Sequence, residues 1–432
     1  MNQIQVYKFG GASVKNAEGF QNVGKIITEF RKDTPLVVVV SATGKTTNQL
    51  EEVVQSKFTD VPKSMILLQG VKEKHIKICQ ELGFQPTDSV FIEINDHFVE
   101  AEWVIEESRE MPYDYAYDQI VSVGELISSR ILFAWLKKIE QKVSWKDARN
   151  LIEVDDTWRE GRVKWKETIQ RIQDQVLPEF NHMDIILTQG FIASTKENNT
   201  VTLGREGSDY TGAILSNALD AESMSIWKDV PGILTADPSV FVNVIKLDRL
   251  SYTEAIEMTY YGAKVIHPKT IQPLQNKNIP LYVKSFIQPE AEGSLISGDI
   301  DLEYPPIVVS ESEQALIHFS SLDLSFIAEH HLARLFDSFE KHRIKVNMMR
   351  NTAISFSVCV HNDASRIATM IKEVEHEYKV VVDHDLELIT VRHYQDAMLP
   401  KLLEEKIVIL EERIRKTLQM VVRNAPAIMY KK

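Results

Sequence analysis

The chain has 432 residues, of which 44% are hydrophobic, and a formal net charge of −13 at pH 7. At roughly 150 residues per domain, this length predicts two or three domains with sizeable cores. The 62 acidic against 49 basic side chains argue against nucleic acid and anionic membranes as partners, because both require a basic surface. No signal-peptide pattern opens the sequence, and Cys79 and Cys359 suggest buried free thiols, so we expect a cytoplasmic protein.

The first 300 residues are predicted to alternate between strands and helices. A strand is expected at 4–9, followed by a helix at about 17–31. The run Leu36–Val40 is continuously apolar, which is typical of a strand buried on both faces of a parallel sheet. Residues 60–117 are mostly helical in pattern and poor in glycine, which indicates an inserted helical layer. This alternation predicts an α/β fold with helices on both faces of the sheet.

Further along this part, the pattern predicts short strands at 184–187 and 225–228 and helices at 126–138 and 211–219. Ser251 and Glu254 form a capping box, which predicts a helix start there.

The residues after the proline pair at 305–306 follow a different pattern. Strands are expected at 315–319, 345–349, 354–360 and 386–391, and helices at 326–342 and 364–378. This β-α-β-β-α-β order is typical of a ferredoxin-like split unit. Residues 399–432 fit either one long helix or two strands.

Three glycine-bearing turns carry charged residues at predicted strand ends or helix starts. Lys8 precedes Gly10 and Gly11, Glu125 ends the turn Ser122–Glu125, and the turn 204–210 carries Arg205 and Asp209. Backbone amides beyond a strand end, together with the amino end of the next helix, bind anions. Each turn alone has an ordinary structural explanation, such as an N-cap or a first-turn acid. Their joint occurrence in one α/β domain indicates a functional site.

Eight segments together resemble the motifs of aspartate kinases, and they occur in the same order. The segments are Lys8–Val14, Ser41–Asn48, Ser122–Glu125, Thr188–Phe191, Gly204–Tyr210, Asp229–Ile233, Thr235–Pro238 and Gly262–Pro268. The tail is similar to the ACT regulatory modules of the same family.

The resemblance implies an amino-acid-kinase-type parallel-sheet sandwich with helices on both faces over residues 1–303, including the helical insertion at about 60–117. It implies a ferredoxin-like ACT α+β domain at 307–395 and a partial second ACT-like unit at 396–432. The implied reaction is phosphoryl transfer from MgATP to the β-carboxylate of L-aspartate, which gives 4-phospho-L-aspartate and ADP. This is the first step of lysine, threonine and methionine biosynthesis. The acceptor carboxylate is already ionised at pH 7, so the protein must supply cations and positioning rather than a base.

The resemblance also assigns roles to individual residues. The catalytic residues are Lys8, which neutralises the transferring phosphoryl group, and Asp209, which organises Lys8. The aspartate pocket is formed by Ser41, Thr47, Glu125, Phe191, Arg205 and Ser208, with Glu125 on the α-ammonium and Arg205 on a carboxylate. The nucleotide contacts Lys8, Gly10, Gly11, Ser13, Lys228, Asp229 and Lys264. No metal ligand is expected from the protein, because Mg²⁺ arrives with ATP. His267 is predicted to be a packed helix-end residue.

The sequence departs from the family at five site positions. Ala12, Glu206, Lys228, Leu234 and Ser239 stand where the family usually has Thr or Ser, Gly, Thr, Tyr and Arg. These changes bear on nucleotide affinity and on the surroundings of Arg205.

Two alternatives are another amino-acid kinase, such as a glutamate or acetylglutamate kinase, and a catalytically silent amino-acid sensor. The Ser122–Glu125 turn and the ACT-like tail argue against the first. The joint presence of Lys8, Arg205, Asp209 and Lys264 argues against the second.

Regulation is predicted to involve a homodimer joined through the ACT-like tails. Lysine-responsive members of the family carry acids where this chain has Asn347 and Ala353. We therefore expect a weak or lost lysine response, with threonine, another amino acid or no ligand as effector.

Overall fold

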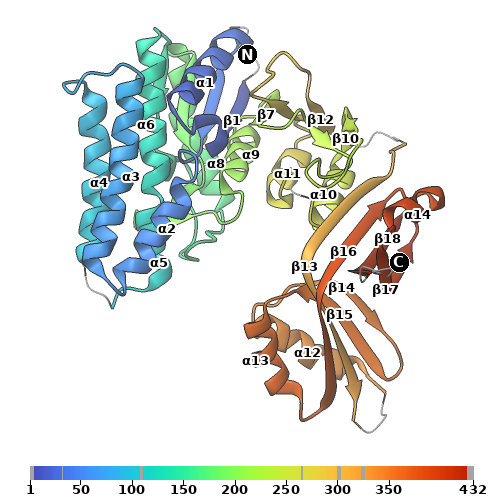
Figure 1. Cartoon of the computed structure of the whole chain (residues 1–432). Helices are drawn as coiled ribbons and strands as arrows, with labels where there is room; N and C mark the ends of the chain where they lie inside the picture. Colours follow the sequence, from blue (N-terminus) through green and yellow to red (C-terminus); the bar gives the residue numbers. More distant parts are fainter. Residues whose placement is uncertain are drawn as a thin grey trace, which may run out of the picture. The chain divides into compact units, whose positions relative to one another are not determined.

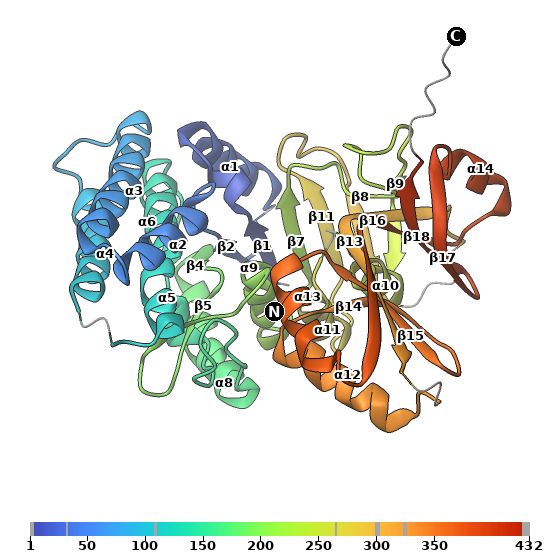
Figure 2. The same cartoon turned by 60° about the horizontal axis from the view of Figure 1, so that its bottom comes forward.

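The computed structural model describes residues 4–31, 33–107, 110–263, 266–298, 303–322 and 326–425 (Figures 1 and 2). The chain folds into two compact units. The first unit comprises Met1–Ile233, Lys246–Ile256 and Val265–Asp301, and the second comprises Leu234–Ile245, Glu257–Lys264 and Leu302–Lys432. Two segments that precede residue 300 therefore belong, by their contacts, to the second unit.

The first unit is built on an eight-stranded sheet. Its strands, in spatial order, are β10 (Arg249–Ser251), β12 (Ser294–Ser297), β11 (Leu281–Ser285), β7 (Ser223–Lys228), β1 (Gln5–Phe9), β2 (Leu36–Val40), β4 (Ile185–Gln189) and β3 (Val143–Trp145). All neighbouring pairs are parallel except β11 with β12. Every residue of β2 is buried, which confirms the expected two-sided strand. The predominantly parallel order places the carboxyl ends of β1, β2, β4 and β7 at one edge, where α/β folds bind their ligands.

Helices cover this sheet, and three of them lie in the 60–117 region. The helices of the first part are α1 (Ala17–Phe30), α2 (Thr46–Lys57), α3 (Val61–Glu81), α4 (Ser89–Glu106), α5 (Tyr113–Val121), α6 (Val123–Lys138), α7 (Ala148–Leu151), α8 (Trp165–Val176), α9 (Gly207–Ala218), α10 (Tyr252–Tyr260) and α11 (Pro268–Gln275). Helices α3, α4 and α6 stand side by side (Figures 1 and 2). The stretch Tyr113–Lys138 is long and apolar enough to cross a membrane, but 72% of its apolar window is buried in the fold, as in a core helix.

Two helices begin earlier than the pattern predicts. Helix α6 starts at Val123 and α9 at Gly207, so Glu125 and Asp209 lie within first turns and not before them. The pattern missed these turns because glycine and small polar residues have low helix propensity. Close packing stabilises the first turn of α6 in spite of this low propensity. A Cβ on Gly124 would lie 3.1 Å from the Cβ of Ala42. The predicted helix start at α10 is confirmed, and the Ser251 hydroxyl accepts from the Glu254 amide at 3.1 Å, which is the N-cap bond of a capping box.

Smaller elements connect these layers. They are the 3-10 turns η1 (Gly11–Val14) and η2 (Pro178–Asn181) and the strand pairs β5 (Ile192–Ser194) with β6 (Thr200–Thr202) and β8 (Ile233–Leu234) with β9 (Lys246–Leu247). Cys79 and Cys359 are both buried and free, as predicted.

The second unit is built on a six-stranded antiparallel sheet. Its strands, in spatial order, are β14 (Val346–Asn351), β15 (Ser355–His361), β13 (Ile307–Ser321), β16 (Tyr378–Arg392), β18 (Thr417–Asn424) and β17 (Lys406–Ile414). Helices α12 (Glu329–Lys341) and α13 (Ala364–Val374) pack on it through a core that includes Phe319, Phe339 and Phe356. The first four strands and these helices form the predicted β-α-β-β-α-β unit.

Strands β13 and β16 are much longer than predicted. They pair along almost their whole length, with a bulge between Glu311 and Gln314 that divides the ladder. The far half of β16 then pairs with β18, and β18 with β17. Of the two interpretations left open for the last residues, the two-strand one is therefore correct, preceded by η3 (Asp396–Met398) and α14 (Leu399–Leu402).

Candidate functional site

A buried lysine and a buried aspartate form the centre of the candidate site. Lys8 lies on β1, between β2 and β7, and its Nζ is 2.6 Å from Oδ1 of Asp209 in the first turn of α9. The Nζ of Lys228, at the end of β7, lies 3.9 Å from the other oxygen of Asp209. Burial raises the pKa of Asp209, but the charges of Lys8 and Lys228 outweigh burial and lower it below its ordinary value. Two cations thus flank an ionised carboxylate at the edge where ligands bind.

The turn after β1 brings backbone amides close to a second loop. The Gly44 amide donates to the Gly11 carbonyl at 3.0 Å, and a Cβ on Gly11 would lie 2.7 Å from the Gly44 oxygen. Only glycine fits at position 11, because this approach leaves no room for a side chain. The Ser13 hydroxyl is buried and donates to the Trp227 carbonyl at 3.4 Å, so it holds η1 against β7. Asp229 is exposed just beyond β7.

Glu125, in the first turn of α6, is buried against the loop after β2. Its Oε1 accepts from the Ala42 amide at 3.4 Å, whereas its Oε2 is buried and has no hydrogen-bond partner among the described residues. Burial raises the pKa of Glu125 to about 8, although the Ala42 amide and the charge of Lys8 oppose the rise. A buried carboxyl oxygen without a partner is costly unless a ligand supplies a donor. An ammonium group would satisfy it.

The other predicted pocket residues lie just after the ends of β2 and β4 and at the start of α2. The Ser41 carbonyl accepts from the Ser128 hydroxyl at 2.7 Å, and Thr47 is half-buried in the first turn of α2. Phe191 follows β4 in a left-handed backbone conformation with φ 71°, and its amide donates to the Thr211 hydroxyl at 3.0 Å.

Arg205 and Ser208 lie at the start of α9. Arg205 is exposed, and Ser208 is buried against Gly190, where an added Cβ would lie 2.4 Å from the Ser208 Cβ. Of the predicted site residues, only Lys264 lies outside the described residues.

His267 caps the amino end of α11. Its Nδ1 accepts from the Lys269 amide at 3.1 Å. Burial lowers the pKa of His267, with Lys269 and Arg205 adding to the fall and Glu206 opposing it. The contact supports the prediction of a helix-end residue.

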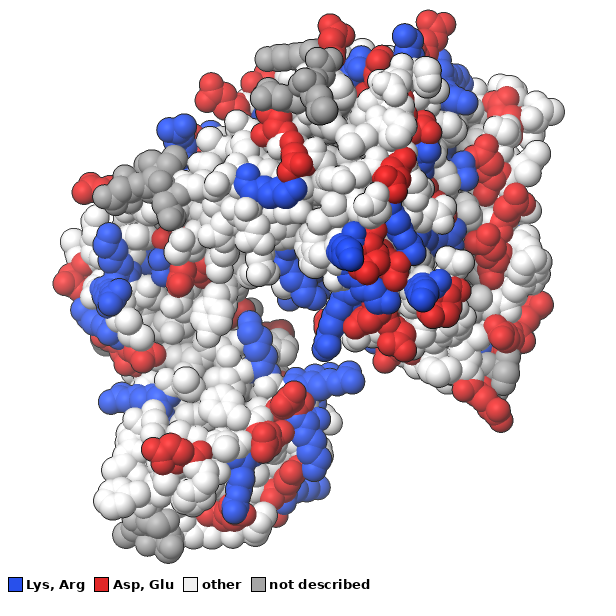
Figure 3. Space-filling view, turned by 180° about the vertical axis from the view of Figure 1, so that it is seen from behind, with Lys and Arg blue, Asp and Glu red and all other residues white. Residues whose placement is uncertain are grey.

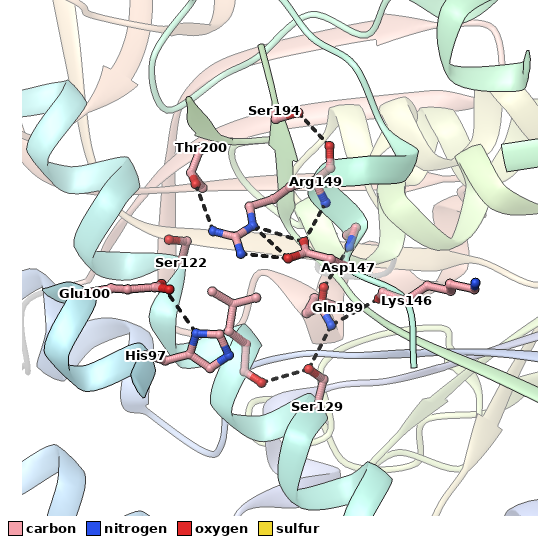
Figure 4. A network of polar contacts seen from close by, with 12 residues as sticks. His97, Glu100, Ser122, Ser129, Lys146, Asp147, Arg149, Gln189, Ser194 and Thr200 are labelled. Carbon is pink, nitrogen blue, oxygen red and sulfur yellow. Dashed lines mark hydrogen bonds and ion pairs between the residues drawn. The ribbon is translucent and has the colours of Figure 1, made fainter. Parts of the chain in front are cut away.

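Gln189, at the end of β4, is a site neighbour to which the sequence assigned no role. Figure 4 shows its side chain at the centre of a polar network: Oε1 accepts from the Ala148 amide at 2.8 Å, and Nε2 donates to the Ser129 hydroxyl at 2.9 Å. Ser129 lies one turn after Glu125 on α6. Gln189 therefore ties the helix that carries Glu125 to the strand that leads into Phe191.

Lys74, on α3, is a second residue near the candidate site to which the sequence assigned no role. Its Nζ donates to the Thr46 hydroxyl at 3.2 Å and to the Gln49 side chain at 3.1 Å. Burial lowers the pKa of Lys74. The helical layer thus contacts the first turn of α2, which contains Thr47, and no local sequence signal distinguishes Lys74 from its neighbouring lysines.

The surface carries charges of both signs. Basic and acidic side chains are interspersed over the face in Figure 3. Across the described parts of the chain, no group of three or more His, Cys, Asp or Glu side chains could hold a metal ion.

Comparison with known proteins gives consistent results. The family model described as "Amino acid kinase family" matches residues 3–285. Lysine-sensitive aspartokinase 3 of Escherichia coli is 30% identical over 84% of this chain and 80% of its own length. The chloroplastic aspartokinase 3 of Arabidopsis thaliana is 31% identical over 89% of this chain and 69% of its own length.

Solved structures agree with these sequence matches. Escherichia coli aspartokinase III in complex with aspartate and ADP has a TM-score of 0.82 at 26% identity, covering 97% of this chain and 96% of that chain. The same enzyme with lysine and aspartate has a TM-score of 0.81 at 25% identity, covering 97% and 95%.

Proposed function

Because the chain belongs to the amino acid kinase family, and within it to the aspartokinases, we propose that it phosphorylates L-aspartate with ATP. An oxygen of the β-carboxylate attacks the γ-phosphorus, the bond from that phosphorus to the β-phosphate oxygen breaks, and 4-phospho-L-aspartate and ADP leave. The observation that carries the proposal is that two lysines, the buried Lys8 and the part-buried Lys228, flank Asp209, while Oε2 of Glu125 has no hydrogen-bond partner among the described residues. The first suits a phosphoryl group, and the second suits the α-ammonium of an amino acid.

The residues take complementary roles in this proposal. Lys8 compensates the charge of the transferring phosphoryl group, and Asp209 keeps Lys8 charged and oriented. Glu125 binds the α-ammonium, and Arg205 binds a substrate carboxylate through its planar fork. Ser41, Thr47, Phe191 and Ser208 shape the pocket.

The nucleotide side combines cations with open backbone. The amides of Gly10 and Gly11 bind phosphate oxygens, and Ser13 positions this turn. Lys228, Asp229 and Lys264 flank the nucleotide. Mg²⁺ enters with ATP and neutralises phosphate charge when bound. The acceptor needs no general base because it is ionised at neutral pH.

The regulatory part of the proposal concerns the second unit. We propose a homodimer joined through this unit, with an amino acid as possible effector, and a cytoplasmic location. Light scattering of the full chain should give twice the mass of one chain.

The test of the reaction is Mg²⁺-dependent ADP release over a panel of amino acids. We expect release to require L-aspartate and to produce an acyl phosphate that hydroxylamine traps as a hydroxamate. Equal or faster turnover with glutamate or N-acetylglutamate would refute the assignment of the substrate.

A further inference from the structure

We propose that Glu206 is a positioning residue of the aspartate site, which fastens the turn carrying Arg205 to the amino end of α11. The inference rests on the proposed function, because Arg205 is taken to bind a carboxylate of aspartate. It concerns a position at which this chain departs from the glycine usual in aspartate kinases.

The backbone of Glu206 adopts a conformation that glycine would hold more easily. Its φ is 54° and its ψ is 27°, in the left-handed region. A residue with a Cβ is disfavoured there, so the glutamate adopts this conformation at a cost that a side-chain interaction can offset. The Glu206 carbonyl accepts from the Asp209 and Tyr210 amides at 3.0 and 3.1 Å. The same residue therefore sets the first turn of α9.

The compensating interaction is a hydrogen bond to the neighbouring helix. Oε2 of the half-buried Glu206 accepts from the His267 amide at 2.8 Å. An ionised acceptor makes this bond stronger than one between neutral groups. At the other end of α9, the Asn217 side chain donates to the Pro273 carbonyl at 2.8 Å. Helices α9 and α11 are thus joined at both ends.

This fastening has a direct consequence for Arg205. Gly204 and Glu206 on its two sides both have positive φ, so the turn would be loose if both were glycine. Glu206 restricts the turn and directs its own carboxylate to the His267 amide. Within the described residues Arg205 takes part in no ion pair, so its guanidinium remains available to substrate.

Two variants test the contribution of Glu206 to the turn. Glu206→Gly removes the bond and relaxes the backbone, whereas Glu206→Gln keeps an acceptor oxygen. Glu140→Gly is the matched control, because Glu140 is also a glutamate with positive φ, 60°, but is exposed and lies beyond the far end of α6.

We expect Glu206→Gly to raise the apparent KM for aspartate about tenfold while kcat and the KM for ATP change less than about twofold. Glu206→Gln should restore the KM to within about threefold of the parent value, and Glu140→Gly should leave it unchanged. An unchanged KM for aspartate in Glu206→Gly, an equal loss for both substrates, or no restoration by Gln would overturn the inference. Absence of aspartate-dependent ADP release in the parent chain would instead overturn the proposed function.

Discussion

Nζ of Lys8 lies 2.6 Å from Oδ1 of Asp209, and both side chains are buried. The two residues are about 200 positions apart in the sequence and meet because β1 and α9 are neighbours in the fold. Lys228, 3.9 Å from the second oxygen of Asp209, adds a further cation. A buried charge is tolerated only when it is paired, so removing one member leaves the others uncompensated. The pair therefore links catalysis to stability.

Replacing Lys8 with alanine should reduce turnover much more than aspartate binding. Its charge acts where phosphoryl charge is redistributed in the transition state, and such contacts are worth about 3–4 kcal/mol, or roughly 10²–10³ in kcat. Steady-state kinetics of Lys8→Ala measures both constants. Lys25→Ala, a change of an exposed lysine on α1, is the control and should behave as the parent. A raised KM with normal kcat in Lys8→Ala would place the residue outside the reacting groups.

A double-mutant cycle should detect the coupling of Lys8 and Asp209. Lys8→Met and Asp209→Asn should each lower the free energy of unfolding by about 3 kcal/mol, because each leaves a buried charge without its partner. The double variant should lose less free energy of unfolding than the two single variants together, since it removes both charges. Urea unfolding gives the three values. Strict additivity would mean that the pair is not coupled in solution.

Substitution of Glu125 should act mainly on substrate binding. The contact with the α-ammonium is made equally in the ground and transition states, so its loss raises KM more than it lowers kcat. We expect Glu125→Ala and Glu125→Gln to raise the apparent KM for aspartate by about 30-fold or more, as for a charge pair worth roughly 2–5 kcal/mol. Kinetics at saturating ATP is the measurement, and parent-like constants in both variants would contradict the assignment.

The raised pKa of Glu125 predicts that aspartate binding depends on pH. Burial holds the carboxyl protonated below its pKa of about 8, whereas an ammonium ligand requires the ionised form. The apparent KM should therefore fall by about tenfold per pH unit as the pH rises from 6 towards 8, and then level off. Calorimetry in two buffers of different ionisation enthalpy should show proton release on binding at pH 7. A KM that rises between pH 6 and 8 would exclude this linkage.

The raised pKa of Glu125 also makes the stability of the ligand-free protein depend on pH. Because the folded-state pKa lies above the unfolded value, Glu125 stabilises the fold at low pH and loses this contribution as pH rises through about 8. Saturating aspartate should reduce the loss. Thermal unfolding with and without aspartate at pH 6 and 8.5 tests this.

Lysine should inhibit the enzyme weakly or not at all. The sequence resemblance predicts that Asn347 stands where lysine-responsive relatives carry an acid. The Nδ2 of Asn347 donates to the buried Gln314 side chain at 2.9 Å. A missing carboxylate would cost a bound ammonium about 2–5 kcal/mol, which is roughly 30-fold or more in affinity. Lysine and threonine are titrated into the activity assay, alone and together. Strong inhibition by lysine at micromolar concentration would contradict the prediction.

The amino-acid sequence alone determined the fold class and the family, and it predicted the residues of the site. Buried parallel strands such as Leu36–Val40 read as continuous apolar runs, because both faces of the strand must avoid water. Glycine at position 11 and the charged residues at strand ends were recognisable because phosphate chemistry restricts which residues can stand there. The β-α-β-β-α-β order of the second unit could also be predicted from the sequence pattern.

Tertiary structure alone decided the helix starts at Val123 and Gly207, the length of β13 and β16, and the strands of the tail. Each depends on pairing or packing between distant segments, which outweighs local propensity. The hydrogen bonds of Gln189, Lys74 and Glu206 belong to the same class, because they join residues 28 to 61 positions apart. A sequence pattern records which side chains are present. Only the folded chain determines which side chains contact one another. The burial that raises the pKa of Glu125 therefore exists only in the folded protein.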